Sequence, residues 1–253
     1  MPIYSLYDDY VRAVMSFNRF LVYNNLKDFR VSEVEDYVSI VNEEVQQYIR
    51  SLLPIREEIF YEMEREAQEN MVPIVEPEVG QLLYWLALTH RSLKVLEIGT
   101  AIGYSTLWLA KAVLPQGGHI TTMEINAPRA EAARKYFKKA GVEEEVDLIF
   151  GDARELLFEL SGHYDFIFLD AAKGKYIEFL EKCVELLNPG GILVAEDVFM
   201  RGMVITGQID KRRNKTAVSR LRTYLELVMS HESLETVILP LGDGVALSTK
   251  KSF

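Results

Sequence analysis

Four charged side chains stand where two neighbouring segments of the chain end, and together they could bind a cation and move a proton. Asp170 follows one apolar run, Glu196 and Asp197 follow the next, and Lys173 comes three residues after Asp170. If both runs are parallel strands about 4.8 Å apart, the carboxylates converge, and a divalent cation with oxygen ligands would relieve their repulsion. Mg²⁺ suits such a site, with Mn²⁺ or Ca²⁺ as alternatives. Lys173 could then act as a base, because a nearby cation lowers the pKa of its ammonium group. The alternative is a surface lysine at a helix start.

Three further acids follow earlier apolar runs. They are Glu97, Glu124 and Asp152. The two oxygens of Glu124 match the vicinal hydroxyls of a ribose, and Asp152 could meet an adenine amino group. Each acid alone is more often a helix N-cap or a solvated loop residue. Three at successive strand ends favour a nucleoside site.

A turn bounded by Gly99 and Gly103 follows the first of these runs. Dinucleotide sites use G-x-G-x-x-G, with the first two glycines one residue apart, and this spacing differs. Glu97 at the approach to the turn would repel a pyrophosphate but suits a cationic ligand such as S-adenosylmethionine. A purely structural strand–turn–helix unit is the alternative.

The elements that position these residues are predicted by apolar runs that alternate with helical patterns, as in parallel βαβ units. Breakers lie between them, for example Pro115–Gly118 and Asn188–Gly191. We predict strands near 94–99, 119–125, 146–150, 165–170 and 191–197, and helices near 104–114, 127–140, 153–160 and 174–187.

The last part of the chain has a different pattern. A long helix is predicted near 215–230, and two β-rich runs, 236–241 and 245–249, flank Gly242-Asp243-Gly244, which is typical of a hairpin. We therefore expect an α/β fold with a mainly parallel seven-stranded sheet, an antiparallel C-terminal hairpin and helices on both faces. This is the Rossmann-like layout of class I methyltransferases.

The first part of the chain is expected to be helical. Residues 56–70 and 77–89 are predicted helices, and residues 1–45, rich in Tyr and Phe, are expected to form an N-terminal helical extension to a domain spanning 46–253. The aromatic stripes of the extension could pack on that domain or on a second copy of the chain. We expect a homodimer.

Composition limits the possible partners and compartment. The formal charge of −10 opposes non-specific binding to nucleic acid or to acidic membranes. No apolar run approaches the roughly 18 residues needed to cross a bilayer, and Asp8, Asp9 and Arg12 are inconsistent with a secretory signal. The single cysteine, Cys183, fits a buried thiol in a reducing cytoplasm.

The region from about Pro54 to Lys250 resembles the metal-dependent O-methyltransferases, which include catechol and caffeoyl-CoA O-methyltransferases. It is most similar to the compact bacterial branch that contains the tRNA 5-hydroxyuridine methyltransferase. The matching segments are Val95–Ser105, Met123–Asn126, Gly151–Ala153, Phe168–Tyr176 and Gly190–Gly202.

The resemblance implies roles for individual residues. Lys173 would be the catalytic base, acting with Asp170, and Asp170, Glu196 and Asp197 would bind the metal. In place of Glu196-Asp197 the family usually has Asp-Asn, and the added charge predicts tighter cation binding or a changed metal preference. The residues implied in binding S-adenosylmethionine are Val75, Glu97, Gly99, Thr100, Gly103, Ser105, Glu124, Asp152, Ala153 and Asp170.

Metal-assisted methyl transfer selects acceptors with two adjacent oxygens. Both 5-hydroxyuridine in tRNA and a small catechol qualify, and the bacterial-branch resemblance favours tRNA. A non-catalytic S-adenosylmethionine-binding protein is the alternative from another class. The basic residues Lys211, Arg212 and Arg213, together with Lys215, Arg220 and Arg222, could contact RNA or form a solvated helix face. Phe199, Met200 and Arg201 are expected to line the substrate entrance, although a core position suits Phe199 equally.

Overall fold

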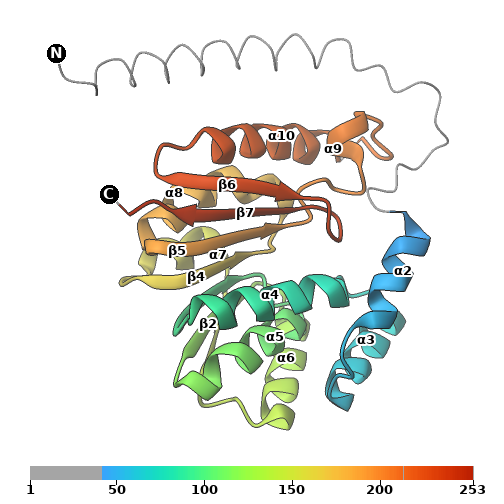
Figure 1. Ribbon diagram of the computed structural model, residues 1–253, viewed down its shortest axis with the longest axis vertical. Coiled ribbons are helices and arrows are strands. Elements are labelled where there is room, and N and C mark those ends of the chain that lie inside the picture. Colours follow the sequence, from blue (N-terminus) through green and yellow to red (C-terminus); the bar gives the residue numbers. More distant parts are fainter. Residues whose placement is uncertain (1–41, 213, 253) are drawn as a thin grey trace. The chain divides into compact units, whose positions relative to one another are not determined.

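A computed structural model describes residues 42–212 and 214–252 (Figure 1). The strands of this part are β1 (Lys94–Ile98), β2 (His119–Glu124), β3 (Val146–Phe150), β4 (Tyr164–Leu169), β5 (Leu187–Glu196), β6 (Leu234–Leu239) and β7 (Val245–Lys250). Its α-helices are α2 (Glu43–Leu52), α3 (Glu58–Asn70), α4 (Pro77–His90), α5 (Tyr104–Val113), α6 (Ala127–Ala140), α7 (Ala153–Glu159), α8 (Tyr176–Leu186), α9 (Met203–Thr206) and α10 (Asn214–Ser230). Short 3₁₀ helices η1 (Leu114–Gln116) and η2 (Lys173–Lys175) complete it.

The strands form one seven-stranded sheet in the order β3-β2-β1-β4-β5-β7-β6. Strands β1 to β5 are parallel, and β7 runs antiparallel to both β5 and β6. The predicted Rossmann-like class I layout with a C-terminal hairpin is therefore confirmed. Helix α9 was not predicted, and only the first residues of α2 lie within the helical extension expected for residues 1–45.

Alternating side chains cover the two faces of the sheet with separate cores, because successive residues of a strand point to opposite faces. On one face Val95 and Phe168 pack with residues of α3, α4, α5 and α6. On the other, Leu96 and Ile167 pack with residues of α7, α8 and α10. Cys183 of α8 is buried in this second core, as predicted. Figure 1 shows helices on both faces.

Strand order reverses between β1 and β4. From β1 the chain builds outward to β2 and β3, whereas β4 lies on the other side of β1 and continues to β5. Ligands of open α/β sheets bind outside the carboxyl ends of the strands at such a switch point. The acids predicted to do chemistry lie at this edge.

Two expectations concern the first residues. The expected boundary between residues 45 and 46 lies within α2, which continues through it. The helical extension expected for residues 1–45 falls mostly outside the described residues. Within the described ranges, no helix has both the length and the apolar character needed to cross a membrane.

Candidate active site

The carboxyl ends of β1 and β4 touch through Gly99 and Asp170. Gly99 has φ +111°, and a Cβ atom there would overlap the carbonyl oxygen of Asp170 and lie 2.7 Å from its carbonyl carbon. The amide of Asp170 donates to the carbonyl of Ile98 at 2.9 Å, and the amide of Gly99 donates to that of Met123 at 3.0 Å. Only glycine permits both this φ value and this contact.

The loop that follows is closed by a second glycine and by an acid. Gly103 has φ +90°, and a Cβ on it would lie 2.5 Å from the ring of Phe137. The carboxylate of Glu124 accepts the amide of Ala101 at 2.8 Å and that of Asn126 at 2.7 Å. Each carboxylate oxygen retains a further lone pair, so the proposed contact with ribose hydroxyls remains chemically possible.

Glu97 lies beneath this loop with no exposed surface. Its carboxylate accepts hydrogen bonds from the hydroxyls of Ser105 and Thr122, each at 2.6 Å, and from that of Thr106. Burial raises the pKa of Glu97 to about 7, although the three hydroxyl donors act in the opposite direction. Thr100, also buried, bonds to Thr122 at 2.6 Å. Direct contact of Glu97 with a cationic ligand stays a prediction.

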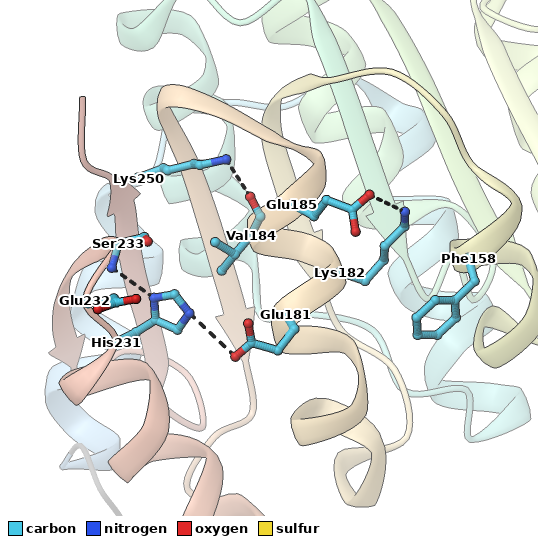
Figure 2. Close-up of a pocket in the computed structure, with 9 residues that line it drawn as sticks. All are labelled: Phe158, Glu181, Lys182, Val184, Glu185, His231, Glu232, Ser233 and Lys250. Carbon is cyan, nitrogen blue, oxygen red and sulfur yellow. Dashed lines mark hydrogen bonds and ion pairs between the residues drawn. The ribbon is translucent and has the colours of Figure 1, made fainter. Parts of the chain in front are cut away.

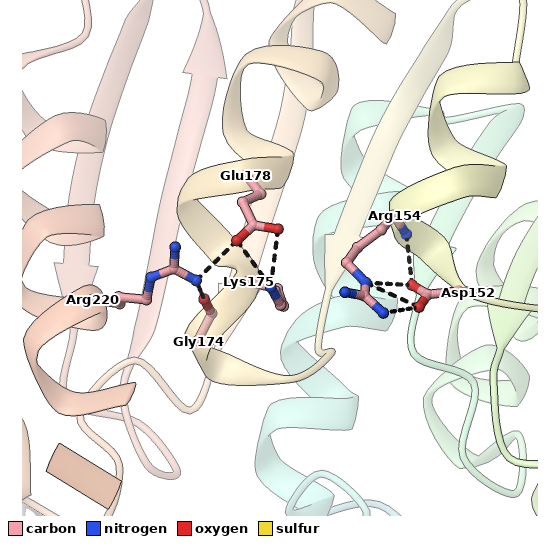
Figure 3. Close-up of polar contacts among 6 residues, drawn as sticks. All are labelled: Asp152, Arg154, Gly174, Lys175, Glu178 and Arg220. Atoms are coloured by element: carbon pink, nitrogen blue, oxygen red, sulfur yellow. Dashed lines mark hydrogen bonds and ion pairs between the residues drawn. The ribbon is translucent and has the colours of Figure 1, made fainter. Parts of the chain in front are cut away.

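The other residues expected at the donor site occupy the flanking elements. Asp152 caps α7 by accepting the amide of Arg154 at 2.9 Å, and the Arg154 guanidinium binds the same carboxylate (Figure 3). Ala153 is the first residue of α7. Val75, in the loop between α3 and α4, is buried in the first core. An adenine contact by Asp152 would therefore compete with Arg154.

Three carboxylates meet around the ammonium group of Lys173. Its Nζ atom lies 2.6 Å from Oδ1 of Asp170, 3.2 Å from Oδ2 of Asp197 and 3.8 Å from Oε2 of Glu196. It also donates to the hydroxyl of Tyr176 at 3.0 Å. The two strand ends and the start of η2 thus bring together the four residues that the sequence singled out.

The charges in this cluster shift the pKa of Lys173 in the direction opposite to that needed for a neutral base. Burial alone would lower it, but the neighbouring carboxylates, first Asp170, outweigh burial and raise the pKa well above its usual value. The pKa of Glu196 is raised well above normal by burial and then by Asp170.

Asp243, in the turn of the β6–β7 hairpin, was not among the predicted site residues. Its carboxyl group accepts the backbone amide of Arg201 and hydrogen-bonds to Asp197. Burial, and then Asp197, raise the pKa of Asp243 to about 8, so its carboxyl is mostly protonated at pH 7. The Gly-Asp-Gly pattern predicted the turn. It did not predict which way the turn's side chain points.

The predicted metal ligands suit a hard divalent cation, because they are carboxylate oxygens and their combined negative charge exceeds the positive charge of Lys173. Within residues 42–212 and 214–252, however, no three acidic, His or Cys side chains form a ready-made metal site. The Lys173 ammonium lies among the three predicted ligands instead.

The residues expected at the substrate entrance form a strained loop after β5. Phe199 packs on the hairpin, where a Cβ on Gly244 would overlap its ring. Met200 and Arg201 have φ values of +47° and +54°. Phe199 is partly buried and Arg201 is exposed, and their place at a substrate entrance stays a prediction.

The expected basic cluster divides into two groups. Arg222 donates to the carbonyl of Val204 at 2.8 Å, and Arg220 binds Gly174 and Glu178 (Figure 3). Lys211 and Arg212 are exposed in the turn before α10, and Arg213 lies outside the described residues.

A pocket of about 690 Å³ lies at the other edge of the sheet (Figure 2). It is lined by Phe158 of α7, by the second half of α8, by residues 231–233 after α10 and by Lys250 of β7. Thr249, next to Lys250, pairs with Ile192 of β5, far from the carboxyl end of that strand. Lys250 donates to the carbonyls of Val184 and Leu187, each at 2.7 Å. This pocket is therefore separate from the acid–lysine cluster.

Comparison with known proteins agrees with the fold. A sequence model of the O-methyltransferase family matches residues 51–251. The catechol O-methyltransferase of Niastella koreensis is 31% identical over 220 residues, which cover 83% of this chain and 97% of that protein. The caffeoyl-CoA O-methyltransferase of Stellaria longipes is 30% identical over 228 residues, covering 85% and 93%.

A solved structure gives the same result in three dimensions. The O-methyltransferase of Bacillus cereus, in complex with SAH, matches with a TM-score of 0.73 at 27% identity, covering 82% of this chain and 97% of that one. Since the family model spans most of the sequence and the fold agrees, the chain belongs to the class I, S-adenosylmethionine-dependent O-methyltransferase family.

Proposed function

We propose that this O-methyltransferase moves a methyl group from S-adenosylmethionine to one of two adjacent oxygens on a small catechol-type acceptor. The supporting observation is the cluster of Asp170, Glu196, Asp197 and Lys173, which lies directly beside the Gly99 turn. The two similar relatives named above are catechol and caffeoyl-CoA O-methyltransferases.

The bond from the donor sulfur to the methyl carbon breaks as the bond from the acceptor oxygen forms, and the hydroxyl proton leaves. The neutral amine of Lys173, formed when its ammonium group has lost a proton, is the proposed recipient of that proton, because its Nζ lies among the proposed cation ligands. Asp170, Glu196 and Asp197 would hold a divalent cation, Mg²⁺ in the first place. When bound, the cation would lower the pKa of the acceptor hydroxyl and of the Lys173 ammonium.

The charge of the site favours a small acceptor over tRNA. RNA binding depends on cations that meet phosphates, whereas Arg220 and Arg222 are bonded within the fold. Lys211, Arg212 and Lys215 remain exposed and could reach a phosphate. At the cluster itself the carboxylates of Asp170 and Asp197 make the approach of a polyanion unfavourable.

A single-turnover assay with methyl-labelled donor tests these alternatives. The acceptors are 3,4-dihydroxybenzoate and tRNA containing 5-hydroxyuridine, each with Mg²⁺ and with EDTA. We expect methylation of the catechol in Mg²⁺ and its loss in EDTA. Methylation of the tRNA alone would overturn the acceptor, and donor binding without any turnover would favour a non-catalytic protein. Arg212→Glu should leave catechol turnover unchanged.

We also propose that the full chain forms a homodimer. Large apolar side chains are exposed on α2 and α4, among them Tyr48, Leu52 and Trp85, and they support a contact surface between two copies of the chain. Light scattering of the complete chain during gel filtration measures its mass, and a monomer at micromolar concentration would contradict this proposal.

A further inference from the structure

Lys173 is the first residue of a short turn. This turn is the 3₁₀ helix η2, between the extended residue Ala172 and the start of α8. Its backbone supplies a 2.8 Å hydrogen bond from Lys175 to Ala172. A Cβ on Gly174, in the middle of the turn, would meet no atom within 4 Å. Side-chain packing at Gly174 therefore cannot fix the backbone next to Lys173.

A guanidinium group from a distant helix contacts this turn. Arg220 of α10 donates from Nη1 to the carbonyl oxygen of Gly174 at 2.5 Å and to Oε1 of Glu178 at 2.8 Å (Figure 3). The ammonium of Lys175 binds both oxygens of Glu178, at 3.0 and 3.2 Å. Arg220 thus holds the carbonyl group of Gly174, and Glu178 links Arg220 to Lys175, the last residue of η2.

These contacts are poorly placed to stabilise the whole fold. The side chains of Arg220 and Glu178 are 39% and 35% exposed, and ion pairs this open contribute little to stability. Helix α10 is held instead by the buried residues Val218, Leu221, Tyr224 and Val228. The contacts of Arg220 act locally, on the residue that follows Lys173.

We propose that Arg220 is a positioning residue for the methyl-transfer reaction, which fixes the Gly174 carbonyl and so holds the Lys173 ammonium at Asp170 and Asp197. This inference rests on the proposed function of Lys173. Glu178 completes the arrangement by holding both Arg220 and Lys175.

The test compares Arg220→Gln with Arg222→Gln. Arg222 lies two residues along the same helix and also donates to a carbonyl, that of Val204, so it is a matched control. With a catechol acceptor we expect Arg220→Gln to lower kcat about 10-fold, since small displacements of reacting groups are costly. The dissociation constant for SAH and the melting temperature should match those of the wild type.

A double-mutant comparison separates positioning from general damage. Glu178→Gln should lower kcat similarly, and the Arg220→Gln, Glu178→Gln pair should be no slower than either variant, because both act through one turn. Arg220→Lys keeps the charge and should recover part of kcat. Wild-type kcat in Arg220→Gln, or an equal loss in Arg222→Gln, would overturn the proposal.

A second measurement does not depend on turnover. In ¹⁵N-lysine spectra the ammonium signal of Lys173, assigned with Lys173→Arg, should shift or broaden in Arg220→Gln and stay unchanged in Arg222→Gln. If the wild type methylates no acceptor, the proposed function fails while this signal still reports the positioning. An unchanged Lys173 signal in Arg220→Gln would refute the positioning role.

Discussion

Gly99 and Asp170 meet backbone to backbone, so closely that a Cβ on Gly99 would lie 2.7 Å from the carbonyl carbon of Asp170. Gly99 belongs to the turn expected to face the methyl donor, and Asp170 is the first acid of the cluster around Lys173. The contact occurs where strand order reverses between β1 and β4. Gly99 therefore allows the turn expected to bind the methyl donor to lie close to the carboxylates around Lys173.

Gly99→Ala should damage both stability and donor binding. Backbone atoms cannot turn away as a side chain can, and φ +111° is unfavourable for alanine. We expect a loss of about 2–4 kcal/mol in the free energy of unfolding and weaker binding of SAH. Urea titration and calorimetry measure the two effects.

Gly141→Ala is the control for Gly99. Gly141 also has a positive φ, +68°, but a Cβ there would meet nothing within 4 Å. Its cost should be only about 1–2 kcal/mol, that of the left-handed conformation, with SAH affinity unchanged. Equal losses in the two variants would show that the contact with Asp170 is unimportant.

Lys173→Met should abolish most turnover while donor binding persists. Removing a positioned proton-transfer group typically costs a factor of about 10²–10⁴. Because the change also leaves Asp170 and Asp197 without their cation, Lys173→Arg serves as the companion that keeps the positive charge. We expect Lys173→Met to lower the melting temperature, and Lys173→Arg to keep it near that of the wild type without recovering kcat. Substantial turnover in Lys173→Met would rule out the proposed role.

Much of this architecture could be predicted because each parallel strand is an apolar run with a breaker or an acid at its end. The predicted strands near 94–99 and 146–150, for example, correspond closely to β1 and β3. The meeting of Asp170, Glu196 and Asp197 was predictable for the same reason, since parallel strands end at one edge.

Other parts of the site depend on tertiary contacts that periodicity does not encode. Asp243 reaches Asp197 only because the β6–β7 hairpin folds back beside β5. The helical pattern predicts an exposed position for Arg220. Its contact with η2 arises only because α10 packs beside that turn. Three hydroxyl groups surround Glu97, two of them from α5, and no sequence pattern predicted that they would bond to one carboxylate.

Stability should fall as pH rises through 7 because of Glu97. Its pKa is raised by burial from 4.5 to about 7, so the folded state binds the proton more tightly than the unfolded state. The associated stability is fully present below pH 4.5 and is lost as pH rises through about 7. Its size is on the order of 3 kcal/mol.

Glu97→Gln isolates this effect. The amide cannot ionise, so the part of the pH dependence due to Glu97 should disappear between pH 5 and pH 8. Urea unfolding of both proteins at several pH values gives the difference directly. If the wild type and Glu97→Gln show parallel curves, Glu97 is already ionised in the folded protein near pH 5.

Asp197→Asn should weaken divalent-cation binding about 10-fold or more, because one carboxylate of the proposed set becomes a neutral amide. Asn tolerates the left-handed conformation of Asp197, φ +56°, so the backbone should not change. Calorimetric titration with Mg²⁺ and Mn²⁺ measures the effect, and Asp210→Asn, at an exposed position, is the control. Equal affinities would remove Asp197 from the proposed ligands.

Asp243 should matter because it secures a strained loop. Asp197, Met200 and Arg201 all have positive φ values, which other contacts must maintain, and Asp243 bonds to Arg201 and Asp197. Asp243→Ala removes both bonds and should lower kcat about 10-fold and stability by about 1–2 kcal/mol. Asp243→Asn can still accept from Arg201 and donate to Asp197, so it should retain most of both. Steady-state kinetics and thermal unfolding of the two variants measure both effects. If Asp243→Ala and Asp243→Asn behave identically, the side chain of Asp243 is not needed. The backbone hydrogen bond from the amide of Phe199 to the carbonyl oxygen of Asp243, at 2.9 Å, would then be enough to hold the loop.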